Sequence, residues 1–195
     1  AYDGVKGKGY YQETIARDVS PGLDASTMPY QLENTGATTF TFNPISWDDR
    51  TAGDNNSSPI PSFIGSKLNA SFFYSDRLGV LSEDNVFLGV ANDSFNFFPK
   101  SALAQVDSDP IDLNVASIRP VTLTDVVPSP QGLLLFSSRQ QFQLYAASSV
   151  TLTPRTSVIR SLSNYEMSSS IRPVDVGTAV VFVNTVPNAS KLFSM

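Results

Sequence analysis

The chain has 195 residues, of which 41% are apolar and 16% are charged, which indicates a folded protein of one or two domains and excludes a disordered chain. Its net charge is −5 and it has no cluster of Lys and Arg, which argues against a general nucleic-acid binder. It contains no Cys and no His, which excludes disulfides, thiolate or imidazole metal sites, and Ser-His-Asp or Cys-His catalysis. Thirteen Phe, seven Tyr and 13 Pro favour strands separated by frequent turns.

The first part of the chain predicts a small β-rich segment. Runs of β-favouring residues between Pro and Gly turn signals indicate three short strands: Tyr10–Ile15, Thr27–Leu32 and Thr38–Phe42. Residues 46–61 are polar and rich in turn formers, which indicates a long connection. We therefore predict two parts: an N-terminal β-rich segment with its connection at residues 1–60, and the main body at residues 61–195.

The main body repeats a hairpin pattern. RLGVLSEDNVFLGVA (Arg77–Ala91) aligns with GLLLFSSRQQFQLYA (Gly132–Ala146), and both have two apolar runs around three polar residues. A looser third copy begins with TAVVFVN (Thr178–Asn184) and ends in SKLFSM. Strand-built repeats of about 40 to 50 residues are typical of propeller blades, in which neighbouring sheets bury each other's faces.

The other expected elements make the chain all-β. Strands are predicted at Leu68–Ser75, Leu78–Ser82, Val86–Ala91, Phe95–Phe98, Ile111–Ser117, Val121–Val126, Leu133–Ser137, Gln141–Ala146, Thr151–Thr153, Val158–Ser161 and Ala179–Asn184. Of these, Phe95–Phe98 is expected to close the first repeat unit, and one helix is expected at Ser101–Val106. The predicted fold class is all-β, with β-propeller-like blades of antiparallel strands preceded by a smaller β-rich segment.

The sole Trp lies beside an Arg in the connection before the body. In WDDR, Trp47 and Arg50 flank two carboxylates. Trp and Arg contribute strongly to binding at protein interfaces, so these two residues are candidate interface anchors. Local packing of the loop is the alternative interpretation, and the sequence favours it.

A second candidate interface site is the acidic segment DSDPID. Its three carboxylates, Asp107, Asp109 and Asp112, could cap a turn, form interface salt bridges or hold Ca²⁺. The spacing matches no EF-hand loop, and Asp-Pro is a common turn starter, so a turn or strand cap is favoured. We expect no metal and no cofactor.

The remaining carboxylates suggest no enzyme site. Glu83 and Asp84 lie in a predicted hairpin turn, and Asp76 is expected to form a local ion pair with Arg77. A glycosidase needs two carboxyl groups about 5 to 10 Å apart around the scissile bond, which sequence neighbours on one loop seldom achieve.

A series of motifs in fixed order resembles one known family. The segments are TMPYQL, FNPISWDDRTAGD, PSFIG, FFYSDRLGVLSEDNV, DSFNFF, DSDPIDLNV, GLLLFS with QQFQL, TLTP, NYEMSS and RPVDVG. From about Thr27 to Met195 they resemble the tail tubular protein B, or tail nozzle protein, of short-tailed bacteriophages (podoviruses). Each motif alone is weak, but ten in the same order are specific.

The resemblance implies a structural protein of the virion tail and no enzyme. It implies a homo-oligomer, a hexameric ring around a channel that passes double-stranded DNA into the host without sequence-specific binding. The implied partners are the adaptor (tail tubular protein A) and tail fibre proteins, and no membrane span is implied. Because family members are several times longer, we expect this chain to be an internal fragment. The alternative is a carbohydrate-binding or glycan-cleaving β-propeller, which would show two carboxylates in one pocket beside exposed rings.

Overall fold

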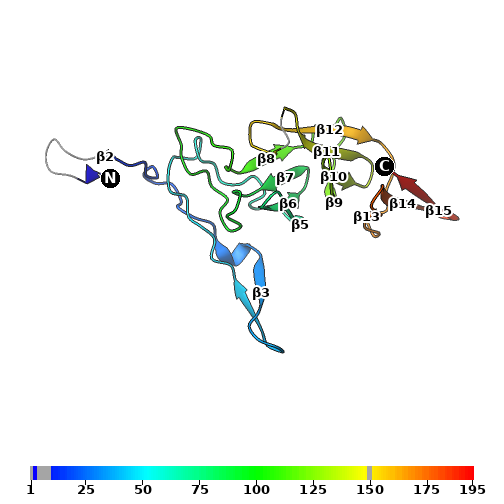
Figure 1. Cartoon of the computed structure of the whole chain (residues 1–195), viewed down its shortest axis with the longest axis horizontal. Helices are drawn as coiled ribbons and strands as arrows, with labels where there is room; N and C mark the ends of the chain where they lie inside the picture. Colours follow the sequence, from blue (N-terminus) through cyan, green and yellow to red (C-terminus); the bar gives the residue numbers. More distant parts are fainter. Residues whose placement is uncertain (1, 4–9, 149–150) are drawn as a thin grey trace.

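The computed structural model describes residues 2–3, 10–148 and 151–195, and across these residues the chain folds into antiparallel strands (Figure 1). The short 3-10 helix η1 (Ala25–Thr27) is the one helical element in the described part, and no helix there is long and apolar enough to cross a membrane. The predicted all-β class is therefore confirmed.

The helix expected at Ser101–Val106 is wrong. The Ser101 Oγ accepts hydrogen bonds from the backbone N–H groups of Leu103 and Ala104 and donates one to the Glu13 carboxylate at 2.8 Å. These bonds resemble a helix N-cap, but no helix continues from it, because the Val106 N–H bonds to the Asp109 carboxylate at 2.8 Å and not to the Ala102 carbonyl.

The N-terminal segment contains two small hairpins. Strand β1 (Tyr2–Asp3) pairs with β2 (Tyr10–Tyr11), and β3 (Tyr30–Asn34) pairs with β4 (Phe40–Pro44). The strand expected from residue 27 begins three residues later, because the Asp24 side chain caps η1. The β3–β4 hairpin stands away from the body as an arm (Figure 1), which we call the arm from here on.

The main body contains three antiparallel sheets within the described residues. The first sheet has the order β5 (Leu68–Tyr74), β6 (Arg77–Ser82), β7 (Asn85–Leu88), β8 (Ile111–Asn114). The second has the order β9 (Leu123–Ser129), β10 (Gly132–Ser137), β11 (Gln141–Ala146), β12 (Ser157–Ser163). The third comprises β13 (Val174–Asp175), β14 (Val180–Val186) and β15 (Ala189–Ser194). The described strands form no closed barrel.

The repeated hairpin occupies the same place in both four-stranded sheets. Its first copy becomes β6–β7 and its second becomes β10–β11, the central strands of each sheet. The strand expected at Phe95–Phe98 is wrong: the fourth strand is β8, which pairs Leu113 with Val86 of β7. No strand forms at Thr151–Thr153, because Thr153 and Thr156 bond to each other in a turn.

The three sheets pack face to face. Successive side chains of a strand point to opposite faces, and β10 is covered on both. Leu133 and Leu135 pack against the first sheet, whereas Leu134 and Phe136 pack against the third. The rings of Phe136 and Phe182 lie 5.6 Å apart at this second contact. The two four-stranded sheets also meet along their first strands, β5 and β9.

The outer face of the first sheet packs on the N-terminal segment. Phe87 of β7 and Met28 share a buried cluster with Phe63, whose ring lies 5.1 Å from that of Phe87. The domain boundary predicted at residue 60 stays a prediction, and this cluster joins residues from both sides of it.

Candidate assembly site

The first candidate interface residue, Trp47, lies at the base of the arm. Its indole stacks on Phe97 with ring centroids 4.9 Å apart and meets Phe95 edge-on at 5.7 Å. Its Nε1–H is buried without a hydrogen-bond partner. Beside it lies an apolar cavity of about 250 Å³, lined by Met28, Tyr30, Ile45, Phe63 and Leu78 among others.

The second candidate residue, Arg50, is buried within the chain. Its guanidinium lies 5.2 Å from the Phe98 ring, and Nη1 donates to the Asn55 side chain at 3.1 Å. Nε and Nη2 have no hydrogen-bond partner. Burial lowers the pKa of Arg50, and the nearby Asp54 carboxylate partly opposes this effect.

The three carboxylates of DSDPID have different internal roles. Asp109 is buried and accepts backbone N–H bonds from Val106 at 2.8 Å and Lys100 at 3.4 Å. Asp112 accepts from the backbone and side chain of Ser62 at 3.0 and 2.6 Å. The Asp107 side chain is exposed. In the described part of the chain no group of three acidic side chains lies close enough to hold a metal ion.

Arg77 holds this acidic loop on the first sheet. Its Nη1 donates to the carbonyls of Gly89 at 2.7 Å, Asp109 at 2.7 Å and Ser108 at 3.1 Å, and its Nη2 to that of Asp107 at 2.6 Å. The side chain is only 2% exposed, and this burial lowers its pKa while the Asp109 carboxylate raises it. The local ion pair expected with Asp76 is wrong, because these carbonyls take the guanidinium.

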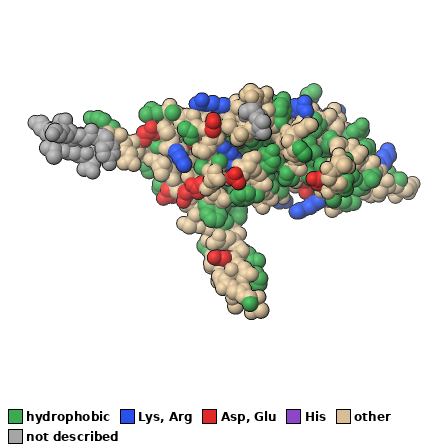
Figure 2. Space-filling model, viewed as in Figure 1, with side chains coloured by type: hydrophobic (Ala, Val, Ile, Leu, Met, Phe, Trp, Pro, Cys, Tyr) green, Lys and Arg blue, Asp and Glu red, His purple; other side chains and the backbone are tan. Residues whose placement is uncertain are grey.

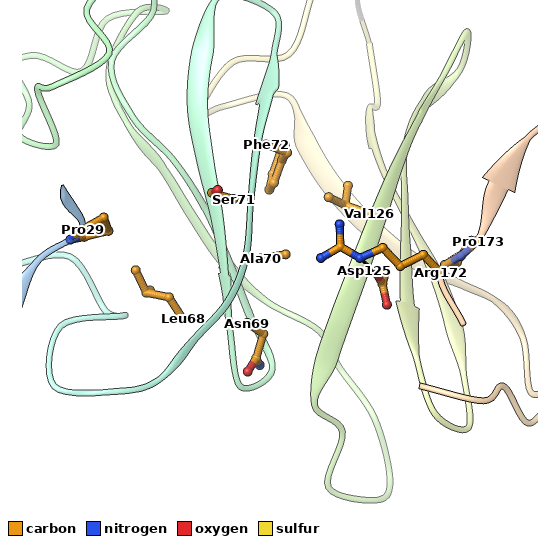
Figure 3. A pocket seen from close by; sticks show the side chains of 10 residues that line it. All are labelled: Pro29, Leu68, Asn69, Ala70, Ser71, Phe72, Asp125, Val126, Arg172 and Pro173. Atoms are coloured by element: carbon orange, nitrogen blue, oxygen red, sulfur yellow. Dashed lines mark ion pairs between the residues drawn. The ribbon is translucent and has the colours of Figure 1, made fainter. Parts of the chain in front are cut away.

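A cavity of about 580 Å³ lies where the first and second sheets meet (Figure 3). Arg172 and Asp125, which both line it, form an ion pair at 3.6 Å, and the side-chain amide of Asn69 donates to the Leu123 carbonyl at 2.9 Å. Asp125 is the one carboxylate among the lining residues, so this cavity lacks the acid pair of a glycosidase.

A second cavity contains two carboxylates, Asp109 and Asp112. Asp109 accepts a hydrogen bond from Val106 in its own loop, and Asp112 accepts one from Ser62, 50 residues earlier in the chain. These bonds account for both carboxylates as structural acceptors. The geometry does not favour the carbohydrate-cleaving alternative.

The bacteriophage nozzle protein family matches the chain over residues 1–195. The chain belongs to this family. It is also 33% identical over 174 residues to the tail tubular protein gp12 of Escherichia phage T7, a match that covers 89% of this chain and 22% of the relative. The chain thus spans about a fifth of that relative's length.

Family membership confirms the resemblance found in the sequence. Nozzle proteins are structural components of the phage tail, so the predicted tail location and non-enzymatic role are also confirmed. The roles of Trp47, Arg50, Asp107, Asp109 and Asp112 at an interface stay predictions.

The sequence analysis predicted the two strands of the arm but did not identify its apolar face as a candidate functional surface. The signal was present, because Tyr30 and Leu32 on one side of an Asn-Thr-Gly turn and Phe40 and Phe42 on the other have two-residue spacing. Such spacing predicts a hairpin with one apolar face. It does not predict that the face stays uncovered.

Proposed function

We propose that the chain forms part of the wall of a tail nozzle, a ring of copies around a channel through which double-stranded DNA enters the host. The match of the nozzle family over residues 1–195 carries the proposal. The name of the T7 relative, a tail tubular protein, supports a tube built in the tail. We further propose that each ring contains six copies and that the adaptor and the tail fibre proteins bind to it.

The body is proposed to be propeller-like. The first and second sheets are both four-stranded antiparallel meanders, they stack face to face, and their first strands are adjacent. Blades of a propeller are arranged in this way. The third sheet continues the stack, and its outer face exposes Val174 and Leu192. A further sheet would bury these side chains, as each preceding sheet buries its neighbour.

The acidic composition suits a channel for DNA. Each phosphate that Lys or Arg neutralises adds affinity through counterion release, so a basic wall would hold the DNA and an acidic wall lets it slide. The net charge of −5 on this part of each copy would amount to about −30 over six copies, a field that disfavours adsorption of a polyanion.

Two measurements on the complete protein test this function. Native mass spectrometry should show a closed oligomer of six copies, and a stable monomer that never enters tails would contradict the ring. Fluorescence anisotropy with labelled duplex DNA should show no measurable binding at low salt. Tight binding with a steep salt dependence would contradict the low-friction channel.

A further inference from the structure

The arm has one apolar and one polar face. Cross-strand partners share a face, and the pairs Leu32–Phe42 and Asn34–Phe40 alternate with Glu33–Thr41. Figure 2 shows apolar side chains along one side of the arm. The apolar face carries Tyr30, Leu32, Phe40 and Phe42, which are 46%, 67%, 59% and 68% exposed.

This face has the properties of an interaction surface. Its four large side chains leave roughly 450 Å² of apolar surface uncovered, which is within the range of functional patches on soluble proteins. An isolated two-stranded hairpin is marginally stable in water, so the arm needs a protein surface against its apolar face. The cavity of about 250 Å³ at its base includes Tyr30 and continues the apolar surface into the body.

The chemistry of the arm excludes two classes of partner. Residues 27–47 contain no Lys or Arg and one acidic residue, Glu33, so they offer no cation to neutralise phosphate. The turn at residues 35–39 (TGATT) is largely polar, so the tip of the arm carries no large apolar side chain that could anchor it in lipid. The apolar residues lie along the side, which suits packing against another protein's sheet.

The distribution of charge along the chain points to a second copy as that protein. Residues 1–110 contain 14 Asp and Glu against 7 Lys and Arg, a net charge of −7. Residues 111–195 contain 4 Asp and Glu against 6 Lys and Arg, a net charge of +2. These six cationic residues are all exposed: Arg119, Arg139, Arg155, Arg160, Arg172 and Lys191. Two copies therefore attract when the acidic part of one meets the basic part of the next.

We propose that copies associate head to tail, with the arm of one copy packing its apolar face on the part formed by residues 111–195 of the next. A head-to-tail contact uses two different surfaces and closes into a ring when the rotation between copies allows. This inference rests on the proposed nozzle ring and adds the contact that builds it. Because the apolar face of the arm is uncharged, two copies can approach there without charge repulsion. The opposite net charges of residues 1–110 and 111–195 favour the head-to-tail orientation.

A matched pair of variants of the complete protein tests the arm. Leu32→Ser with Phe42→Ser removes apolar surface at one cross-strand pair, whereas Glu33→Ser with Thr41→Ser changes the adjacent pair on the polar face. We expect the first variant to reduce the ring fraction at least tenfold at fixed concentration, with an unchanged circular dichroism spectrum of the free copy. The second should assemble like the unchanged protein. Equal assembly of both variants would overturn the proposal.

Photo-crosslinking identifies the surface that receives the arm, and it does not depend on the serine variants. A benzophenone amino acid replaces Phe42 in the complete protein, and isotopically labelled and unlabelled copies are mixed, assembled and irradiated. Mixed-isotope adducts in residues 111–195 would support the proposal. A ring whose adducts lie within one copy, or form only when another tail protein is added, would overturn this contact alone. If no ring forms in any preparation, the proposed nozzle ring is wrong as well.

Discussion

Replacing Arg77 by Met should destabilise the chain by several kcal/mol. Met keeps much of the volume and removes every donor, so the carbonyls of Gly89 and Asp109, which bond to Arg77 in buried surroundings, lose their partner. Each unsatisfied buried carbonyl costs about 1 to 3 kcal/mol, which gives roughly 2 to 6 kcal/mol for the pair. Arg77→Lys should cost about half as much, because an ammonium has three donors and no planar fork.

Urea denaturation followed by the fluorescence of Trp47 measures this loss. The sole Trp packs on the cluster at the outer face of the first sheet, the sheet that carries Arg77, so its signal reports on that sheet. Arg155→Met is the control: it removes one exposed hydrogen bond, from Nη2 to the Gln105 carbonyl, and should cost about 1 kcal/mol or less. If Arg77→Met costs no more than this control, the buried carbonyls do not depend on the guanidinium and our reasoning is wrong.

Three further predictions concern stability and pH. Gly132 has φ of +126° and a Cβ there would overlap the Leu144 carbonyl oxygen, so Gly132→Ala should lower the urea midpoint, with a cost of about 2 kcal/mol or more; an unchanged midpoint would refute this. Phe182→Ala should loosen the third sheet with a cost of about 3 to 5 kcal/mol, seen as faster hydrogen exchange in β14 and β15 and not in β6 and β7; uniform change would refute local stacking. Hydrogen bonds from Ser57 and Asn56 lower the pKa of Asp54. Their stabilisation of the loop is fully present above the ordinary carboxyl pKa of about 3.9 and is lost as the pH falls through the lowered pKa. An NMR titration of Asp54 with a midpoint at or above about 3.9 would contradict this.

The central strands could be predicted because burial on both faces is visible in the sequence. GLLLFS has apolar side chains at successive positions, as expected of a strand between two sheets, and it forms β10. The prediction of a strand at Phe95–Phe98 was wrong because a short apolar run can also form a buried loop. The pairing of β7 with β6 ends soon after Gly89, and Asn92 turns the chain with a φ of 60°. Phe97 then packs into the buried cluster at the outer face of the first sheet.

The candidate site was harder to predict because its contacts join distant residues. The sequence offered Arg77 an adjacent carboxylate, Asp76, whereas the structure gives it carbonyls of residues 12 and 32 positions away, Gly89 and Asp109. No local pattern encodes such partners. In the same way, the alternation of apolar and polar residues that produces the arm is local. Whether another described part of the chain covers its apolar face depends on the whole fold.

Electron cryo-microscopy of the purified tail tests the central proposal most directly. We predict a closed ring in which the arm of each copy lies against residues 111–195 of the next and the copies together surround a DNA-sized channel. A map in which the chain lies outside the tube wall, or in which neighbouring copies do not touch, would contradict the proposal.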